Sequence, residues 1–274
     1  MGFFSWLFKR KTPKYKLGLA LGSGGAKGFA ELGVLRAFEE NGITFDCVGG
    51  TSIGSIISAA YAEGFSSIEI TELLKSVDYS EITNLFMIRM DMTGMFKVLD
   101  KTLGGKNIEQ LVKPYIAIGT EVETGEEKVF SSGNLAEALC ASCSIPPFFK
   151  PMVIDGKRYV DGAFSNSVPS DRVRELGADY VVAVDLSNHQ AKPSMISKFI
   201  PTYKGKVEKP WLKGYEFADV MIHPNLNKYQ ATSFGSWAEM YDIGYASAIS
   251  VMPQILQDIQ LLKNGKYKKL KGKQ

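Results

Sequence analysis

Residues 15–28 read YKLGLALGSGGAKG and residues 45–54 read FDCVGGTSIG, and these two stretches decide the fold. In each, a short apolar run ends in glycines and leads into a segment with helical spacing, which is typical of a buried strand, a tight turn and a helix. Ser66-Ser67-Ile68-Glu69 resembles a capping box that opens a further helix, to about residue 77. Further strands are expected at 115–121, 126–130, 151–154 and 179–185, and helices at 134–143, 169–176 and about 233–262. This alternation predicts a mostly parallel sheet with helices on both faces.

Length and composition bound the class of protein. The chain has 274 residues, of which 45% are hydrophobic and 22% charged, values that exclude a disordered, collagen-like or coiled-coil chain. Three cysteines are too few, and odd in number, for a disulfide framework, so we expect a reducing compartment. No run of 18 apolar residues occurs, so no spanning helix is predicted. We expect a cytoplasmic protein in which residues 15–262 form the domain, 1–14 an amphiphilic basic segment and 263–274 a Lys-rich tail.

The net charge of +3 is unevenly distributed. Residues 1–16 hold five basic side chains and 263–274 hold six lysines, so the middle of the chain, which holds all 29 acidic residues, is net acidic. Nucleic-acid binding is disfavoured, because the positive charge lies on the tails and not on a domain face. The N-terminus suits a peripheral contact with an anionic membrane, because a basic cluster follows its aromatic side chains; these are Phe3, Phe4, Trp6 and Phe8. The alternative is a hydrophobic N-terminus docked on its own domain.

The glycine-rich turn runs from Gly22 to Gly28. It is not a dinucleotide fingerprint, because the third glycine position of that motif holds Lys27. It is not a phosphate-binding P-loop either, because Lys27 is followed by glycine and not by Ser or Thr. Its amides would point outward at a helix N-terminus, which suits an anion, although tight-turn packing alone would also explain it.

The second motif, Gly50-Thr51-Ser52-Ile53-Gly54, is a G-x-S-x-G pattern between a strand and a helix. That context is what a nucleophile elbow requires. The flanking glycines permit the tight turn, so Ser52 can project its hydroxyl above the sheet edge, where the helix dipole favours negative charge.

A serine nucleophile needs a base, and the chain has only two histidines. His189 lies in a polar loop, and His223 follows the strand-like stretch 218–222, so a Ser-His-Asp triad through His223 is formally possible. Asp161 is the better partner, because Gly162 behind it lets the carboxylate approach a neighbouring loop closely. An Asp-Gly pair is also a common hairpin turn, but Asp155-Gly156 fits that role better.

The ordered motifs GSGGAKG, GTSIG and DGA resemble the patatin-like phospholipase family. The stretches GVLRAFEENGI and ASCSIPPFFKPMVIDGKRYVDGAFSNSVP agree, and the resemblance spans roughly residues 15–225. It implies a three-layer α/β/α fold, distinct from the ordinary α/β hydrolases, and a Ser-Asp dyad without histidine. Two small departures are Ser23 and Ala163, which stand where the family often has glycine; neither puts the dyad in doubt.

Carried over by position, the resemblance makes Ser52 the nucleophile and Asp161 the base of a lipid acyl hydrolase of phospholipase A, lysophospholipase or esterase type. The amides of Gly24, Gly25 and Ala26 would form the oxyanion hole. Supporting positions of the motifs are Gly22, Lys27, Gly28, Gly50, Gly54 and Gly162. The implied substrate is a phospholipid or lysophospholipid ester, with no metal and no cofactor. Acyl transfer on the same dyad and a non-catalytic lipid-binding role stay open as alternatives.

Two further segments are ambiguous in sequence. Residues 79–105 are rich in methionine and suit either a lid or acyl-chain wall, or ordinary core packing. Cys140-x-x-Cys143 falls in an apolar helical stretch without a second cysteine pair or a nearby histidine, which favours packing over a metal site.

Overall fold

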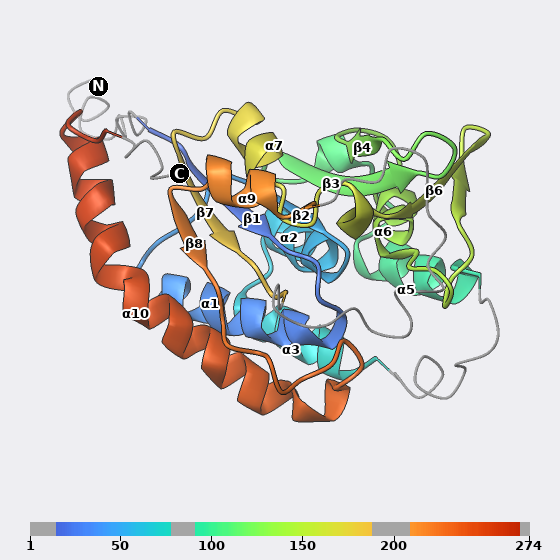
Figure 1. The fold of residues 1–274 in the computed structure, drawn as a ribbon, viewed down its shortest axis with the longest axis horizontal. Coiled ribbons are helices and arrows are strands. Elements are labelled where there is room, and N and C mark those ends of the chain that lie inside the picture. Colours follow the sequence, from blue (N-terminus) through green and yellow to red (C-terminus); the bar gives the residue numbers. More distant parts are fainter. Residues whose placement is uncertain (1–14, 78–90, 188–208, 269–274) are drawn as a thin grey trace, which may run out of the picture.

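Eight strands form one mixed sheet at the centre of the computed structural model (Figure 1), which describes residues 15–77, 91–187 and 209–268. The strands run in the spatial order β5-β6-β3-β2-β1-β7-β8, and β4 also pairs with β3. Their bounds are β1 Leu17–Leu21, β2 Cys47–Thr51, β3 Tyr115–Glu121, β4 Glu127–Phe130, β5 Met152–Ile154, β6 Lys157–Asp161, β7 Tyr180–Val184 and β8 Val220–Ile222.

The sheet has a parallel part and an antiparallel part. β3, β2, β1, β7 and β8 pair in parallel, while β4 and β6 are antiparallel to β3, and β5 is antiparallel to β6. The antiparallel part follows from its connections, because the Asp155-Gly156 turn joins β5 and β6 with positive φ at both residues (49° and 75°), the geometry of a two-residue hairpin. The mostly parallel sheet expected from the sequence is thus confirmed, with five of the eight strands in the parallel part.

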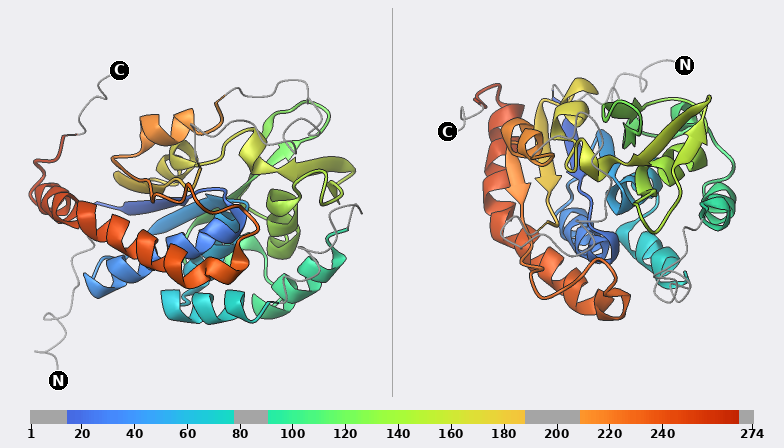
Figure 2. Two further views of the ribbon diagram at one scale, coloured as in Figure 1. Left: turned by 60° about the horizontal axis from the view of Figure 1, so that its bottom comes forward. Right: turned by 45° about the vertical axis from the view of Figure 1, so that its right-hand side comes forward.

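Helices cover both faces of the sheet, which makes three layers. Their bounds are α1 Phe29–Glu40, α2 Ile53–Glu63, α3 Ser67–Lys75, α5 Thr93–Thr102, α6 Leu135–Cys143, α7 Ser170–Glu175, α9 Leu212–Phe217 and α10 Trp237–Lys263. In Figure 1, α7 and α9 lie above the sheet, while α1 and α3 lie below it and α10 runs along α1. Figure 2 shows the long helix α10 from two further sides. The three-layer α/β/α architecture is confirmed.

The two faces of β1 pack against different partners. Leu17, Leu19 and Leu21 alternate onto the face that carries the large hydrophobic core with α1, α2 and α10. Gly18 points the other way, where a methyl group would lie 2.5 Å from Cγ1 of Val173. Helix α7 therefore packs directly on the backbone of β1, because that face carries no large side chain.

Local signals set several boundaries correctly. The capping box at Ser66 is present, with its hydroxyl accepting the Glu69 amide and the Glu69 carboxylate accepting the Ser66 amide, so α3 begins at Ser67. Helix α10 continues to Lys263, close to the predicted end.

Two of the described helices were not predicted. α5 lies in the methionine-rich segment, of which Met92 and Leu99 are buried in the core. α9 begins at the end of the stretch 187–214, whose prolines and lysines predicted a long surface loop. The rest of the methionine-rich segment (79–90), the N-terminal segment 1–14 and His189 lie outside the described residues, and their predictions stay predictions. Among the described helices, none is long and apolar enough to cross a bilayer.

Candidate active site

The first component of the site is the turn between β2 and α2, which holds Ser52. Its backbone angles are φ 56° and ψ −127°, in the left-handed half of the map, which is strained for a residue with a side chain. The Ser52 carbonyl accepts the amide of Ser55 at 2.9 Å and its hydroxyl at 2.6 Å. The Ser52 amide donates to Oγ of Ser142 at 2.9 Å. The backbone is thereby fixed on both sides of the serine.

The glycines of this turn are demanded by close packing. A methyl group at Gly50 would lie 2.2 Å from the Gly54 carbonyl, and one at Gly54 would lie 2.6 Å from the Leu21 carbonyl. The start of α2 therefore rests against the end of β1, which brings Ser52 beside the glycine-rich turn that follows β1.

Asp161 comes from the antiparallel part of the sheet. It is the last residue of β6 and pairs with Gly119 of β3, while Thr51 pairs with Ile118 of the same strand. Ser52 directly follows β2, and Asp161 ends β6. Because β2 and β6 flank β3, the two residues lie at nearly the same level along β3. At Gly162 a methyl group would lie 2.4 Å from the Ile118 carbonyl, so only glycine lets the chain leave β6 this close to β3.

The environment of the Asp161 carboxyl suits a base. The side chain is completely buried, and burial raises its pKa to about 6, while the Ser52 hydroxyl and the Ala163 amide both favour the charged form. Oδ1 accepts the Ala163 amide at 2.8 Å. Oδ2 forms no well-aligned hydrogen bond to any described residue. Above pH 6 Asp161 is thus a carboxylate with one uncommitted oxygen beside a serine hydroxyl.

The glycine-rich turn lies at the start of α1. The Gly22 amide donates to Oε1 of the buried Glu31 at 2.7 Å, and a methyl group at Gly28 would lie 2.4 Å from Cγ1 of Ile53. Lys27 is half-buried; burial lowers its pKa and the charge of Asp185 opposes that shift. Glycine at positions 22 and 28 therefore serves close packing of the turn against β7 and α2.

The backbone donors in this turn differ from the prediction at one position. The Ala26 amide donates to the Ala231 carbonyl at 2.7 Å, so Ala26, predicted as a third donor of the oxyanion hole, is already engaged. The amides of Gly24 and Gly25 donate to no described residue. Gly25 has φ 56°, in the region that favours glycine. Of the three amides predicted for the oxyanion hole, those of Gly24 and Gly25 are thus without a hydrogen-bond partner among the described residues.

The loop after Asp161 holds the motifs together. Its carbonyls at Ser167 and Asn166 accept the Ser23 amide at 3.0 Å and the Thr51 hydroxyl at 2.8 Å. The Thr120 hydroxyl donates to the Asp161 carbonyl at 3.0 Å. These contacts were not predicted from the sequence; the signal for them was the polar string SNSVP at residues 165–169, shortly after Asp161.

His223 is distant from the serine. It lies just after β8, three strands from β2 in the sheet order, which is about 14 Å at the usual strand spacing. Its Nδ1 is 2.9 Å from the Tyr215 hydroxyl and 4.0 Å from Oδ2 of Asp185. A triad of Ser52 and His223 is therefore not assembled.

The cysteines of the CxxC string are buried in α6. Burial raises the pKa of the Cys140 thiol to about 12 and that of Cys143 well above its ordinary value, so both stay protonated and pack in the core. In the described ranges no group of three or more His, Cys, Asp or Glu side chains is placed to hold a metal ion.

Two cavities lie away from these residues. One, of about 260 Å³, is lined by residues around the start of β3, including Val112 and Tyr115. The other, of about 220 Å³, is lined by residues around the start of β1, including Leu17 and Asp46. Both are at the amino ends of parallel strands, so neither overlaps the Ser52 site, which lies beyond the carboxyl ends.

Comparison with known proteins finds a matching family model and similar sequences. A family model described as "Patatin-like phospholipase" matches residues 19–173. The neuropathy target esterase sws of Drosophila melanogaster is 29% identical over 273 residues, covering 84% of this chain and 19% of that protein. An NTE family protein of Mycobacterium bovis is 32% identical over 191 residues, covering 68% of this chain and 53% of that protein. The chain thus spans only part of the relatives it matches.

Among solved structures, VipD from Legionella pneumophila superposes with a TM-score of 0.60 at 14% identity, covering 89% of this chain and 67% of VipD. At that identity the likeness concerns the fold alone.

Proposed function

Because the chain belongs to the patatin-like phospholipase family, we propose that it hydrolyses carboxylic esters of lipids, with Ser52 as nucleophile and Asp161 as general base. One observation carries the proposal: a strained serine at the N-terminus of α2 lies beside a fully buried carboxyl whose second oxygen is uncommitted. That pair provides both the nucleophile and the proton acceptor that acyl transfer needs.

In the first step the Ser52 hydroxyl attacks the ester carbonyl. Asp161, a carboxylate above pH 6, accepts the hydroxyl proton as the new C–O bond forms. The proton then passes to the leaving alcohol as the tetrahedral intermediate collapses, which leaves the acyl group on Ser52.

The charge that develops on the carbonyl oxygen needs donors. The amides of Gly24 and Gly25, which donate to no described residue, are the candidate donors. In comparable sites each oxyanion donor contributes about 2.7–4 kcal/mol. The 11-residue helix α2 begins directly after Ser52, and its N-terminal dipole adds stabilisation of negative charge.

Deacylation uses the same base. Asp161 takes a proton from water as the water attacks the acyl-enzyme, and returns it to the Ser52 oxygen as the fatty acid leaves. The chemistry balances with water as the only co-reactant.

Phospholipid and lysophospholipid esters are the proposed substrates. Ile53 and Ile56, on the first two turns of α2 after Ser52, are apolar and only partly buried. They offer an apolar wall beside the nucleophile of the kind that an acyl chain requires.

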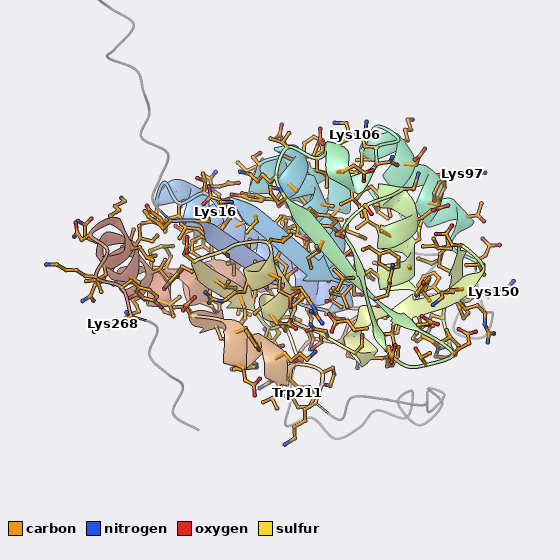
Figure 3. All side chains as sticks on the ribbon, turned by 90° about the horizontal axis from the view of Figure 1, so that it is seen from above. Lys16, Lys97, Lys106, Lys150, Trp211 and Lys268 are labelled. Carbon is orange, nitrogen blue, oxygen red and sulfur yellow. The ribbon has the colours of Figure 1, made fainter. Side chains whose placement is uncertain are left out.

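We also propose peripheral membrane contact through the N-terminal segment. This hypothesis rests on the sequence of residues 1–14, which combines aromatic and basic side chains. In Figure 3, Lys16 and Lys268, which mark the described ends of the two basic tails, lie at one end of the molecule, away from Lys97 and Lys150. Removing residues 2–8 is expected to weaken binding to anionic vesicles while hydrolysis of a short soluble ester is kept; unchanged vesicle binding would refute this role.

The test of the proposed function is fatty-acid release from mixed phospholipid and lysophospholipid vesicles. Wild type is compared with Ser52→Ala and with Ser250→Ala, whose serine is exposed on α10. We expect release by wild type and by Ser250→Ala, and loss of at least about 1,000-fold in Ser52→Ala.

A fluorophosphonate, which phosphonylates activated serines, gives a second measurement without lipid. Peptide mass spectrometry should locate the adduct on Ser52. Release that persists in Ser52→Ala, or an adduct on another serine, would contradict the assignment of Ser52.

A further inference from the structure

The last turn of α6 and the residue that follows it contact both members of the dyad, and from this we propose that Ser142 is a positioning residue that holds Ser52 in its strained, reactive conformation. The inference rests on the proposed function of Ser52 and Asp161. The family resemblance assigns Ser142 no role, and Ser142 lies 90 residues from Ser52 in sequence.

Ser142 holds the amide of the nucleophile. Its Oγ accepts the Ser52 N–H at 2.9 Å, and the Ser142 side chain is fully buried. The carbonyl of Ser52 is held within α2 by Ser55, whereas the amide has Ser142 as its hydrogen-bond partner. One hydroxyl therefore fixes the entry side of the elbow.

The residue that follows α6 places the same turn against Asp161. The Ser144 carbonyl accepts the Asp161 amide at 3.0 Å. Between them, Cys143 is buried, and burial, together with the charge of Asp161, raises the pKa of its thiol. The end of α6 thus bonds to the nucleophile through Ser142 and to the base through Ser144.

The backbone conformation explains why the amide needs a partner. With φ at 56°, Ser52 occupies a region that costs of order 1–3 kcal/mol and persists only where neighbours over-determine it. If the Ser142 hydroxyl is removed, the peptide before Ser52 can rotate toward an ordinary conformation. That rotation moves Oγ away from Asp161 and from the Gly24 and Gly25 amides together.

A purely structural serine would behave differently, and the chain offers a matched control. Ser58 is also fully buried, and its hydroxyl donates to the Gly54 and Ser55 carbonyls of its own helix at 2.7 and 3.2 Å. Ser58→Ala therefore removes the same buried atom from the second turn of α2 without touching the Ser52 amide.

The experiment measures kcat and KM on a short soluble ester, and the second-order rate of fluorophosphonate labelling, for wild type, Ser142→Ala and Ser58→Ala. In Ser142→Ala we expect kcat and the labelling rate to fall about 10- to 100-fold, equivalent to about 1.4–2.8 kcal/mol, with KM unchanged. The inflection of the pH profile should stay near 6 or rise, because the Asp161 carboxyl stays buried while the Ser52 hydroxyl, which favours its charged form, has moved away. Ser58→Ala should match wild type within about twofold.

Three results separate the possibilities. Equal kcat and labelling rates in Ser142→Ala and Ser58→Ala would overturn the inference, as would a downward shift of the pH inflection, which would mean that the charged form of Asp161 has gained stabilisation. The inference would also be overturned if the loss of kcat is fully accounted for by a lower thermal unfolding midpoint, or by a smaller fraction of protein molecules that can be labelled at the active-site serine. If Ser52 is neither labelled nor required, the proposed function itself fails, and that result is visible before any Ser142 variant is compared.

Discussion

Two aspartates lie buried at the same edge of the sheet, and they are bonded very differently. Asp161 ends β6 and Asp185 directly follows β7; both are at most 1% exposed. Asp185 accepts the Ser187 amide at 2.9 Å, the Ser187 hydroxyl, and the Tyr215 hydroxyl at 3.0 Å. Asp161 accepts one well-aligned hydrogen bond, and its Oδ2 has none among the described residues.

The difference shows that burial alone does not make a base. Hydrogen bonds to the charged form hold a carboxylate ionised but occupy the lone pairs that a base must use. Asp185 is committed on both oxygens, and its charge also acts on Lys27, so it stabilises the glycine-rich turn. Asp161 keeps one oxygen for the Ser52 proton and has a pKa raised to about 6.

The largest expected effect comes from neutralising each aspartate in turn. Asp161→Asn should lower kcat by about 1,000-fold, the middle of the range for loss of a general base, because an amide cannot accept the Ser52 proton. Asp185→Asn keeps an acceptor oxygen for Ser187 and should lower kcat by less than about tenfold. Steady-state kinetics on a short soluble ester measure both.

Circular dichroism of both variants is the control for folding. Comparable losses of kcat in the two variants would remove the distinction between the aspartates. An active Asp161→Asn variant would contradict the assignment of Asp161 as the base.

The substitution Asp161→Asn, which should lower kcat, should raise the stability of the folded state. The folded-state pKa of Asp161 is about 6 against an ordinary 3.8, so between pH 4 and 6 the folded state keeps a proton that the unfolded chain has released. Wild type therefore loses stability as pH rises through that window, by about 3 kcal/mol in total. Asp161→Asn cannot ionise and escapes this loss.

Denaturant unfolding at pH 4 and pH 7.5 measures the effect. The advantage of Asp161→Asn over wild type should grow by up to about 3 kcal/mol between the two pH values. A constant difference would mean that the buried carboxyl titrates at its ordinary value, and the contrast with Asp185 would then rest on hydrogen bonding alone.

The pH dependence of kcat/KM sharpens the comparison further. Asp161 must be ionised to act, so kcat/KM should be level above pH 6 and fall about tenfold per unit below it. The Asp185→Asn variant should keep this inflection, because the Asp185 carboxyl of the wild type takes no proton from Ser52. An inflection that disappears in Asp185→Asn would transfer the role of base to that residue.

The sequence allowed the turn around Ser52 to be placed because an apolar run, a turn flanked by glycines and a helical pattern follow one another within a few residues. The collisions that require glycine at Gly54 and Gly162 involve Leu21 and Ile118, which are distant in sequence and were not needed for that prediction. The same reasoning predicted the hairpin at Asp155-Gly156. Each of these depends on a few consecutive residues.

What could not be predicted depends on register between distant segments. Ser142 meets the Ser52 amide only because α6 packs against β3, and the Ala26 amide is engaged only because the chain before α10 returns to the glycine-rich turn. A third oxyanion donor at Ala26 was therefore a sound expectation from the motif alone and disagrees with the folded chain.

The smallest expected effect is at His223. It lies three strands from Ser52 and pairs with Tyr215 beside the saturated Asp185. His223→Ala should therefore leave kcat on a soluble ester within about twofold, because removing a partly exposed side chain far from the nucleophile costs no transition-state contact. Tyr215→Phe, which removes the hydroxyl between His223 and Asp185, tests the same network from its other side. A loss of 100-fold or more in both variants would restore the histidine triad and make Asp185, not Asp161, the acid that orients it.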